Sequence, residues 1–136
     1  MKNLIIIILL LPTFIFSQNK KEEKKAVKSA INWLTQIDNN NYMDSWDSSG
    51  KYFQNQIQKD RWSATLTASR LPLGKLISKR KLKSSEYKTE LPGVPDAKYY
   101  IFSFDVSYEN KNRALETVTL VYDSEGMWKV VGFFIK

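Results

Sequence analysis

The sequence predicts an α+β domain in which N-terminal helices pack on a curved four-stranded antiparallel sheet. Three observations lead to this fold class. Apolar residues recur at helical spacing in residues 27–37. From Tyr99 to Lys136 apolar residues instead alternate at a period of two, in segments separated by polar turns, as strands with one buried face require. The chain has 136 residues, which is enough for one packed core and too few for two.

Residues 1–17 have the parts of a signal peptide. A positively charged start precedes an apolar run from Leu4 to Phe16, and a small residue follows the run. We predict cleavage before Gln18, which makes residues 18–136 a single secreted or periplasmic domain. The alternative is a retained membrane anchor, but the apolar run is shorter than the roughly 20 residues of a spanning helix and is interrupted by Pro12. We expect no stable membrane span after cleavage.

Three helices are expected in the first half of the mature chain. Asn19 and Glu22 have the spacing of a capping box and predict the start of the first helix, which ends at a polar turn over residues 38–41. A short helix is expected over residues 42–48. Asp60 is a suitable cap for a third helix that runs to about residue 69, where a proline and a glycine follow.

Four strands are expected to follow as a meander. The long basic segment 75–87 alternates only loosely and suits a bent strand near a sheet edge. A proline-rich loop over residues 91–96 leads into a strand over residues 99–108. A polar turn at residues 110–113 and a strand over residues 116–122 come next.

The last turn, residues 123–126, suits a type I turn with its glycine in the left-handed conformation, and it sets the register of the final hairpin. The predicted cross-strand pairs are Tyr122 with Trp128, Leu120 with Val130, Val118 with Gly132, and Glu116 with Phe134. This register leaves an apolar set on the opposite sheet face: Ile101, Val121, Val131, Phe133 and Ile135. Because a face open to water is normally more polar, we predict a homodimer through this set.

Composition excludes several kinds of chemistry. The chain contains no histidine and no cysteine, so serine–histidine triads, cysteine nucleophiles and the usual zinc sites are excluded. No metal and no cofactor are expected, and an enzyme of this composition would have to use carboxylates, lysine or tyrosine. The formal net charge is +7. Outside the cytoplasm this charge favours envelope polyanions, acidic partners or anionic lipid head groups as partners over nucleic acid.

A set of aromatic, arginine, proline and glycine positions extends over nearly the whole mature chain. Its members are Trp33, Leu34, Tyr42, Ser45, Trp46, Trp62, Arg70, Pro72, Leu73, Gly74, Arg80, Leu91, Pro92, Gly93, Pro95, Glu116, Gly126, Trp128 and Gly132. On these positions the chain resembles a bacterial family of secreted proteins known only as a domain of unknown function. The order of its elements resembles the cystatin-like cone fold of nuclear transport factor two and the ketosteroid isomerases. The resemblance implies a fold and brings no activity with it.

Glu116 is the best candidate for a catalytic carboxylate. Its position in the alternation places it on the buried face, with Tyr108 expected beside it across the turn, and a buried carboxylate is costly unless it is paired. The alternative explanation is a structural ion pair of Glu116 with Arg70 or Arg80.

Four aromatic residues are candidates to line a ligand pocket between the helices and the sheet: Trp33, Tyr42, Trp46 and Trp62. Together with Arg70 and Arg80 they would suit a small apolar or anionic ligand. The alternative explanation is that they are core anchors.

The residues therefore leave several functions open. We expect a secreted or periplasmic, non-catalytic binding module of unknown ligand. The alternative is a small cofactor-independent enzyme, isomerase-like or hydrolase-like, that uses Glu116. A weaker alternative is an envelope protein that binds polyanions through a basic edge, which consists of Lys75, Lys79, Arg80, Lys81, Lys83 and Lys88.

Overall fold

The computed structural model describes residues 13–136, with side chains from Asn19 onward. Its elements are α1 (Thr13–Asp38), α2 (Tyr42–Asp47), α3 (Lys51–Gln56), α4 (Lys59–Ser69), the single 3-10 turn η1 (Leu71–Leu73), β1 (Lys81–Lys88), β2 (Tyr99–Tyr108), β3 (Lys111–Tyr122) and β4 (Trp128–Ile135). The α+β class is confirmed, as is the order of helices before strands. Most of the predicted signal peptide lies outside the described residues.

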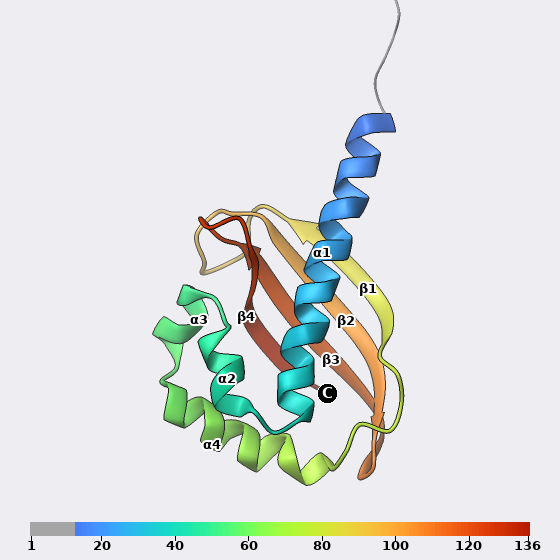
Figure 1. Cartoon of the computed structure of the whole chain (residues 1–136), viewed down its shortest axis with the longest axis vertical. Coiled ribbons are helices and arrows are strands. Elements are labelled where there is room, and N and C mark those ends of the chain that lie inside the picture. Colours follow the sequence, from blue (N-terminus) through green and yellow to red (C-terminus); the bar gives the residue numbers. More distant parts are fainter. Residues whose placement is uncertain (1–12) are drawn as a thin grey trace, which may run out of the picture.

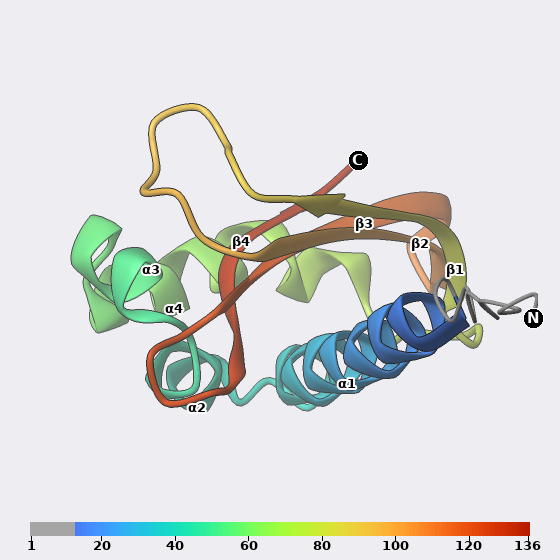
Figure 2. The same ribbon diagram turned by 90° about the horizontal axis from the view of Figure 1, so that it is seen from above.

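The strands form one antiparallel meander in the order β1-β2-β3-β4, as predicted. Helix α1 runs along one face of the curved sheet, and its first turns project beyond the end of the sheet (Figure 1). We call the face that packs against α1 the inner face. The connection between β1 and β2 lies on the opposite, outer side (Figure 2).

The core lies between α1 and the inner face, because alternate residues of each central strand are apolar and point there. Phe102 and Val118 are fully buried, as are Ala30 and Leu34 on the facing side of α1. Burial of one large apolar side chain is worth about 1.5–3 kcal/mol, so these alternating positions fix which face of the sheet is covered.

Two helix boundaries differ from the prediction. Helix α1 already begins at Thr13, so Asn19 and Glu22 lie inside it and the predicted capping box is wrong. The position of the predicted cut before Gln18 also lies within α1. The helix continues through these residues because no proline or glycine separates Thr13 from Asn19.

Helix α3 was not predicted. The start of this helix is held against β4. Its N-cap is Gly50, whose backbone N–H donates to the carbonyl of Val130 in β4 at 2.7 Å. Helix α4 is capped by Gln58 rather than by Asp60, which lies within its first turn. The end of α4 at Ser69 agrees with the prediction.

Strand β1 is shorter than expected, because residues 75–80 do not form a regular ladder. This segment touches β2 through an isolated bridge between Leu76 and Tyr108 and through a bond from the Ile77 N–H to the Ser107 carbonyl, 2.9 Å long. Strand β3 begins earlier than expected, at Lys111, which pairs with Tyr108. The polar turn of this hairpin is therefore tighter than the predicted one.

A bulge in β4 overturns part of the predicted register. Tyr122 pairs with Trp128 and Leu120 with Val130, as predicted. The register then shifts by one residue, so the predicted pairs of Val118 with Gly132 and Glu116 with Phe134 are wrong. The observed pairs are Val118 with Phe133, Thr119 with Gly132 and Glu116 with Ile135.

The shift turns Phe133 and Ile135 toward the core, because one extra residue in a strand reverses the face of every residue after it. Both residues pack against the buried cluster, and the Phe133 ring meets the Trp33 ring edge-on at 5.2 Å. The predicted outer apolar set of Ile101, Val121, Val131, Phe133 and Ile135 is therefore wrong in two members. Phe134 is the residue that faces outward, with 49% of its surface exposed.

The outer face is partly covered by the chain itself. The loop before β2 lies over it and leaves an apolar groove of about 270 Å³, bordered by Val94, Pro95, Val121 and Val131. The homodimer through this face stays a prediction. None of the helices that the structure describes is long and apolar enough to cross a membrane.

Candidate functional site

Glu116 is the best-defined polar group in the interior. It points from β3 into the core, where its side chain is 1% exposed. Arg80 donates from Nε to Oε2 at 2.6 Å and from Nη2 to Oε1 at 3.1 Å. The hydroxyl of Tyr108 donates to Oε1 as well. The carboxylate is thus held by three donors, as a buried charge requires.

A second carboxylate, Asp38, extends this arrangement to the helices. Asp38 is the last residue of α1, and it accepts bonds from Nη1 and Nη2 of Arg80 at 2.7 and 2.8 Å. Arg70, at the end of α4, donates to the same carboxylate from Nη2 at 3.3 Å. We call Asp38, Arg70, Arg80, Tyr108 and Glu116 the buried network.

Two guanidinium groups balance two carboxylates in this network. A carboxylate at the C-terminal end of a helix is unfavourable for the helix dipole, and the two arginines offset that cost at Asp38. Burial alone would lower the pKa of Arg80, but its hydrogen bonds to Asp38 and Glu116 and their charges outweigh burial and raise it. Arg80 therefore stays protonated.

Tyr108 is fixed as a hydrogen-bond donor. Burial raises the pKa of its hydroxyl well above the usual range, and the charge of Glu116 and the bond to it raise this pKa further. The guanidinium of Arg70 lies over the Tyr108 ring, 4.3 Å from the ring centroid. The hydroxyl is consequently unsuited to act as a base or a nucleophile near neutral pH.

Arg70 occupies the inner side of the network, with its side chain 3% exposed. Its Nη1 donates to the carbonyl of Gly74 at 2.7 Å, whereas its Nε has no partner among the described residues. Gly74 adopts a positive φ of 76°, which allows the chain to turn back over the guanidinium. The network thus holds the ends of α1 and α4, the segment before β1, and β3 together.

The predicted aromatic residues are mostly satisfied by internal partners. The indole N–H of Trp33 donates to the Ser45 carbonyl at 2.8 Å and to Ser49 Oγ at 2.9 Å. The indole N–H of Trp62 donates to Ser45 Oγ at 2.9 Å. Trp62 also packs edge-on against Phe53, with 4.8 Å between the ring centroids. These contacts are those of core anchors.

Of the other two predicted aromatics, Tyr42 belongs to the buried core, and Trp46 is partly buried and packs against it. Trp46 donates its indole N–H to the Ile57 carbonyl at 2.8 Å, and the Tyr42 hydroxyl donates to the side chain of Asn40 at 3.0 Å. Trp33 borders a groove of about 200 Å³, and Trp62 borders a separate groove of about 350 Å³. The predicted aromatic set therefore does not converge on one cavity.

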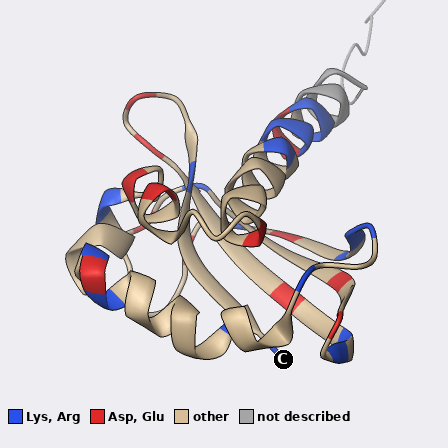
Figure 3. Cartoon of the chain, turned by 60° about the horizontal axis from the view of Figure 1, so that its bottom comes forward, with Lys and Arg blue, Asp and Glu red and all other residues tan. Residues whose placement is uncertain are grey.

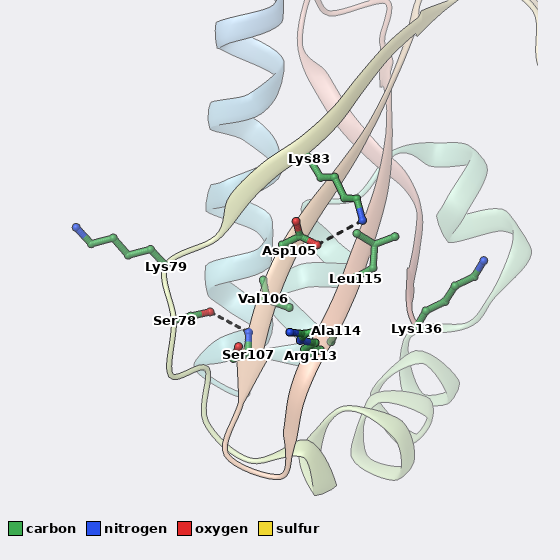
Figure 4. A pocket seen from close by; sticks show the side chains of 10 residues that line it. All are labelled: Ser78, Lys79, Lys83, Asp105, Val106, Ser107, Arg113, Ala114, Leu115 and Lys136. Carbon is green, nitrogen blue, oxygen red and sulfur yellow. Dashed lines mark hydrogen bonds and ion pairs between the residues drawn. The ribbon is translucent and has the colours of Figure 1, made fainter.

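The largest groove described, about 670 Å³, lies where the segment before β1 passes the lower ends of β2 and β3 (Figure 4). Lys79, Lys83, Arg113 and Lys136 line it, with Asp105 as the opposing acid. We call these four bases and the space between them the basic groove. Figure 4 shows Lys83 reaching toward Asp105, 3.8 Å away, and Lys79 extending outward at one side.

The basic edge predicted from the sequence is thus divided between two roles. Arg80 is withdrawn into the buried network, whereas Lys79 and Lys83 remain at the surface. Basic residues also gather on α1 between residues 20 and 28 (Figure 3). Among the residues that the structure describes, no group of three or more His, Cys, Asp or Glu side chains is placed to hold a metal ion.

Sequence reasoning missed two of these groups. Asp38 was assigned to a polar turn, because its partners lie 32 and 42 residues away in the sequence. Arg113 was likewise assigned to a turn, although it lies in β3. The only signal for Asp38 was its position at the end of an apolar helix pattern, where a basic residue is the more usual choice.

Comparisons with known proteins bear on the family and leave the activity open. Residues 29–133 match the family described as "Protein of unknown function (DUF4019)". A search of the curated proteins finds no match. The match spans most of the chain, including all members of the buried network.

Proposed function

We propose that this chain, which belongs to the DUF4019 family of proteins of unknown function, is a non-catalytic binding module of the cell envelope. The observation that carries the proposal is the closure of the buried network. Glu116 is 1% exposed and held by Arg80 and Tyr108, so a substrate has no access to its carboxylate.

The same observation weighs against the alternative of a small enzyme. An acid–base role needs a group with a pKa near the working pH within reach of a substrate. Tyr108 has its pKa raised far from neutrality, and Arg80 is held protonated by two carboxylates. A closed and charge-balanced set of this kind is typical of a structural tie between elements.

The basic groove is the surface that we propose for partner binding. It joins bases from the segment before β1, from β1, from β3 and from the residue after β4, and Asp105 is the acidic side chain that lines it with them. The net charge of +7 adds a long-range attraction for anions. An extended anionic partner, such as an acidic polysaccharide, fits this open groove better than a small ligand that needs enclosure.

Secretion and the cone fold belong to the same proposal. The sequence of residues 1–17 supports export, and helices on a curved antiparallel sheet support the cystatin-like assignment. An exported position would bring the basic groove into contact with the anionic polymers of the envelope.

The test measures binding of the purified protein to dextran sulfate, with neutral dextran as the comparison. The triple variant Lys79→Gln, Lys83→Gln and Arg113→Gln removes three of the four positive side-chain charges that line the basic groove. The matched control, Lys24→Gln, Lys28→Gln and Lys51→Gln, removes the same number of exposed charges elsewhere.

The proposal predicts that affinity for dextran sulfate falls in the groove variant and holds in the control, and that wild-type affinity falls as salt rises. Equal losses of affinity in the two triple variants would mean that the interaction depends on net charge and not on the basic groove. Undiminished affinity in the groove variant would remove the basic groove as the binding surface.

A further inference from the structure

One end of the inner face carries an aromatic side chain from each of the four strands. Tyr87 comes from β1, Tyr100 from β2, Tyr122 from β3 and Trp128 from β4. Neighbouring ring centroids are 5.3 Å apart for Tyr87 and Tyr100, 5.0 Å for Tyr100 and Trp128, and 5.1 Å for Tyr122 and Trp128. The four residues form a continuous row, which we call the aromatic row.

The part of α1 that faces this row is polar. Further along, α1 presents Ala26 and Ala30 to the sheet, and both are fully buried. Opposite the aromatic row it presents Asn19 and Glu22 instead, and a cavity of about 470 Å³ separates helix from sheet. Aromatic side chains that served only as core would be covered by apolar residues at this point.

The floor of the cavity is buried and its sides are accessible. Tyr100 and Trp128 are buried, and their polar atoms reach α1: the Tyr100 hydroxyl contacts the Asn19 carbonyl at 3.4 Å, and the Trp128 indole N–H donates to Glu22 at 3.3 Å. Tyr87 and Tyr122 are half exposed. Their rings therefore offer open faces to a bound molecule.

Three lysines surround the same cavity: Lys21 and Lys25 from α1, and Lys98 from the loop before β2. Lys25 pairs with Glu22 at 3.2 Å. Lys21 and Lys98 form no ion pair with any residue that the structure describes, and the Lys98 ammonium lies 5.4 Å from the centroid of the Tyr122 ring. The cavity thus combines aromatic faces with three lysines and one acid, Glu22, whose pKa is lowered by its bond to Lys25 and by the charge of Lys98.

We propose that this cavity binds a small organic anion that carries a flat or apolar-faced ring. The ring would stack on the faces of Tyr87 and Tyr122, and a carboxylate, sulfonate or phosphate would meet Lys21 and Lys98. The volume of about 470 Å³ lies in the range of small-molecule sites. This site is on the opposite face from the outer groove near Val121 and shares no residue with the basic groove, so it stands independently of the proposed function.

The test compares probes that separate the two parts of the recognition. Naphthalene-2-sulfonate carries an aromatic ring system and one sulfonate, and digalacturonate carries two sugar rings and two carboxylates. Naphthalene-2-methanol carries the ring system without charge, and inorganic sulfate carries charge without a ring. Binding is measured by calorimetry, and the indole N–H signal of Trp128 is followed by NMR. We expect at least one ring-bearing anion to bind more tightly than both partial probes and to shift the Trp128 signal.

The two ring-bearing probes separate the sources of the ring. Tighter binding of naphthalene-2-sulfonate indicates an aromatic ligand, and tighter binding of digalacturonate indicates a sugar acid. Either result supports the site. If neither ring-bearing anion binds more tightly than both naphthalene-2-methanol and inorganic sulfate, or if binding leaves the Trp128 signal unmoved, the proposal is overturned.

Matched variants locate the binding. Lys21→Gln with Lys98→Gln should weaken the tighter probe roughly fivefold, as expected for two partly exposed charge contacts, whereas Lys24→Gln with Lys28→Gln should leave it unchanged. Tyr122→Ser should weaken it roughly tenfold. Tyr52→Ser removes an equally exposed tyrosine, 37% against 36%, and should have no effect. Equal effects of the cavity and control variants would overturn the proposal.

Discussion

The guanidinium of Arg80 bridges two carboxylates that belong to different layers of the fold, Glu116 in the sheet and Asp38 at the end of α1. Arg80 Nε lies 2.6 Å from Glu116 Oε2, and Arg80 Nη1 lies 2.7 Å from Asp38 Oδ2. The side chains of Arg80 and Glu116 are 7% and 1% exposed. A pair this deeply buried is costly to break, because the remaining charge loses its partner without regaining water.

Glu116→Gln should therefore destabilise the protein by about 3 kcal/mol, since it removes one of the two charges that compensate the arginines. The measurement is the free energy of unfolding in urea. Glu86→Gln, at an exposed position of β1, serves as the control and should change the free energy by less than about 0.5 kcal/mol. Equal small effects in both variants would mean that the buried network contributes little to stability.

Tyr108 should make stability depend on pH in the alkaline range. Its hydroxyl pKa is raised above the ordinary value of 10.0, so the folded state holds the proton more tightly than the unfolded chain. The contribution to stability is full below pH 10 and is lost as pH rises above it. Urea unfolding between pH 9 and pH 11 measures the loss.

In Tyr108→Phe the alkaline fall in stability should be shallower than in the wild type. It should not vanish, because burial also raises the pKa of Tyr42, Tyr99 and Tyr100. An unchanged slope in this variant would contradict the assignment of Tyr108 as a permanent hydrogen-bond donor.

The bulge in β4 predicts opposite behaviour for two adjacent phenylalanines. Phe133 packs edge-on against Trp33 and contacts the core, so Phe133→Ser should cost about 3 kcal/mol. Phe134 is half exposed, so Phe134→Ser should cost less than about 1 kcal/mol. Thermal or urea unfolding measures both costs. A larger loss of stability in Phe134→Ser than in Phe133→Ser would contradict the bulge and favour the register without it.

Gly50 should not tolerate a side chain, because a Cβ atom built there lies 2.8 Å from Cγ1 of Val131. Gly50→Ala should destabilise the protein by about 1–2 kcal/mol through overpacking between α3 and β4. Val131→Ala removes the obstructing methyl groups. In that background Gly50→Ala should lower the free energy of unfolding by less than it does in the wild type. Additive losses in the double variant would show that the two sites are not in contact.

The sequence predicted those parts of the fold that depend on local pattern. The alternation of Tyr100, Phe102 and Phe104 was enough to assign the buried face of β2, and the glycine at residue 126 was enough to assign its turn, where φ is 76°. The placement of Glu116 beside Tyr108 followed from the same alternation.

Features that depend on distant contacts were not predictable in this way. The bulge that redirects Phe133 is a single-residue event in a strand whose apolar residues are contiguous, so both registers bury an apolar side chain. Asp38 became part of the candidate site through partners from α4 and from the segment before β1. The aromatic row could not be predicted, because its four members are spread over residues 87–128 and meet only when the sheet is assembled.

The affinity of Glu116→Gln for dextran sulfate, measured at a temperature where this variant is folded, tests the central claim most directly. If the buried network is structural and the partner binds at the surface, the variant is less stable but binds the polymer within about twofold of the wild type. Loss of binding in the folded variant would contradict this account and would mean that Glu116 takes part in binding the polymer.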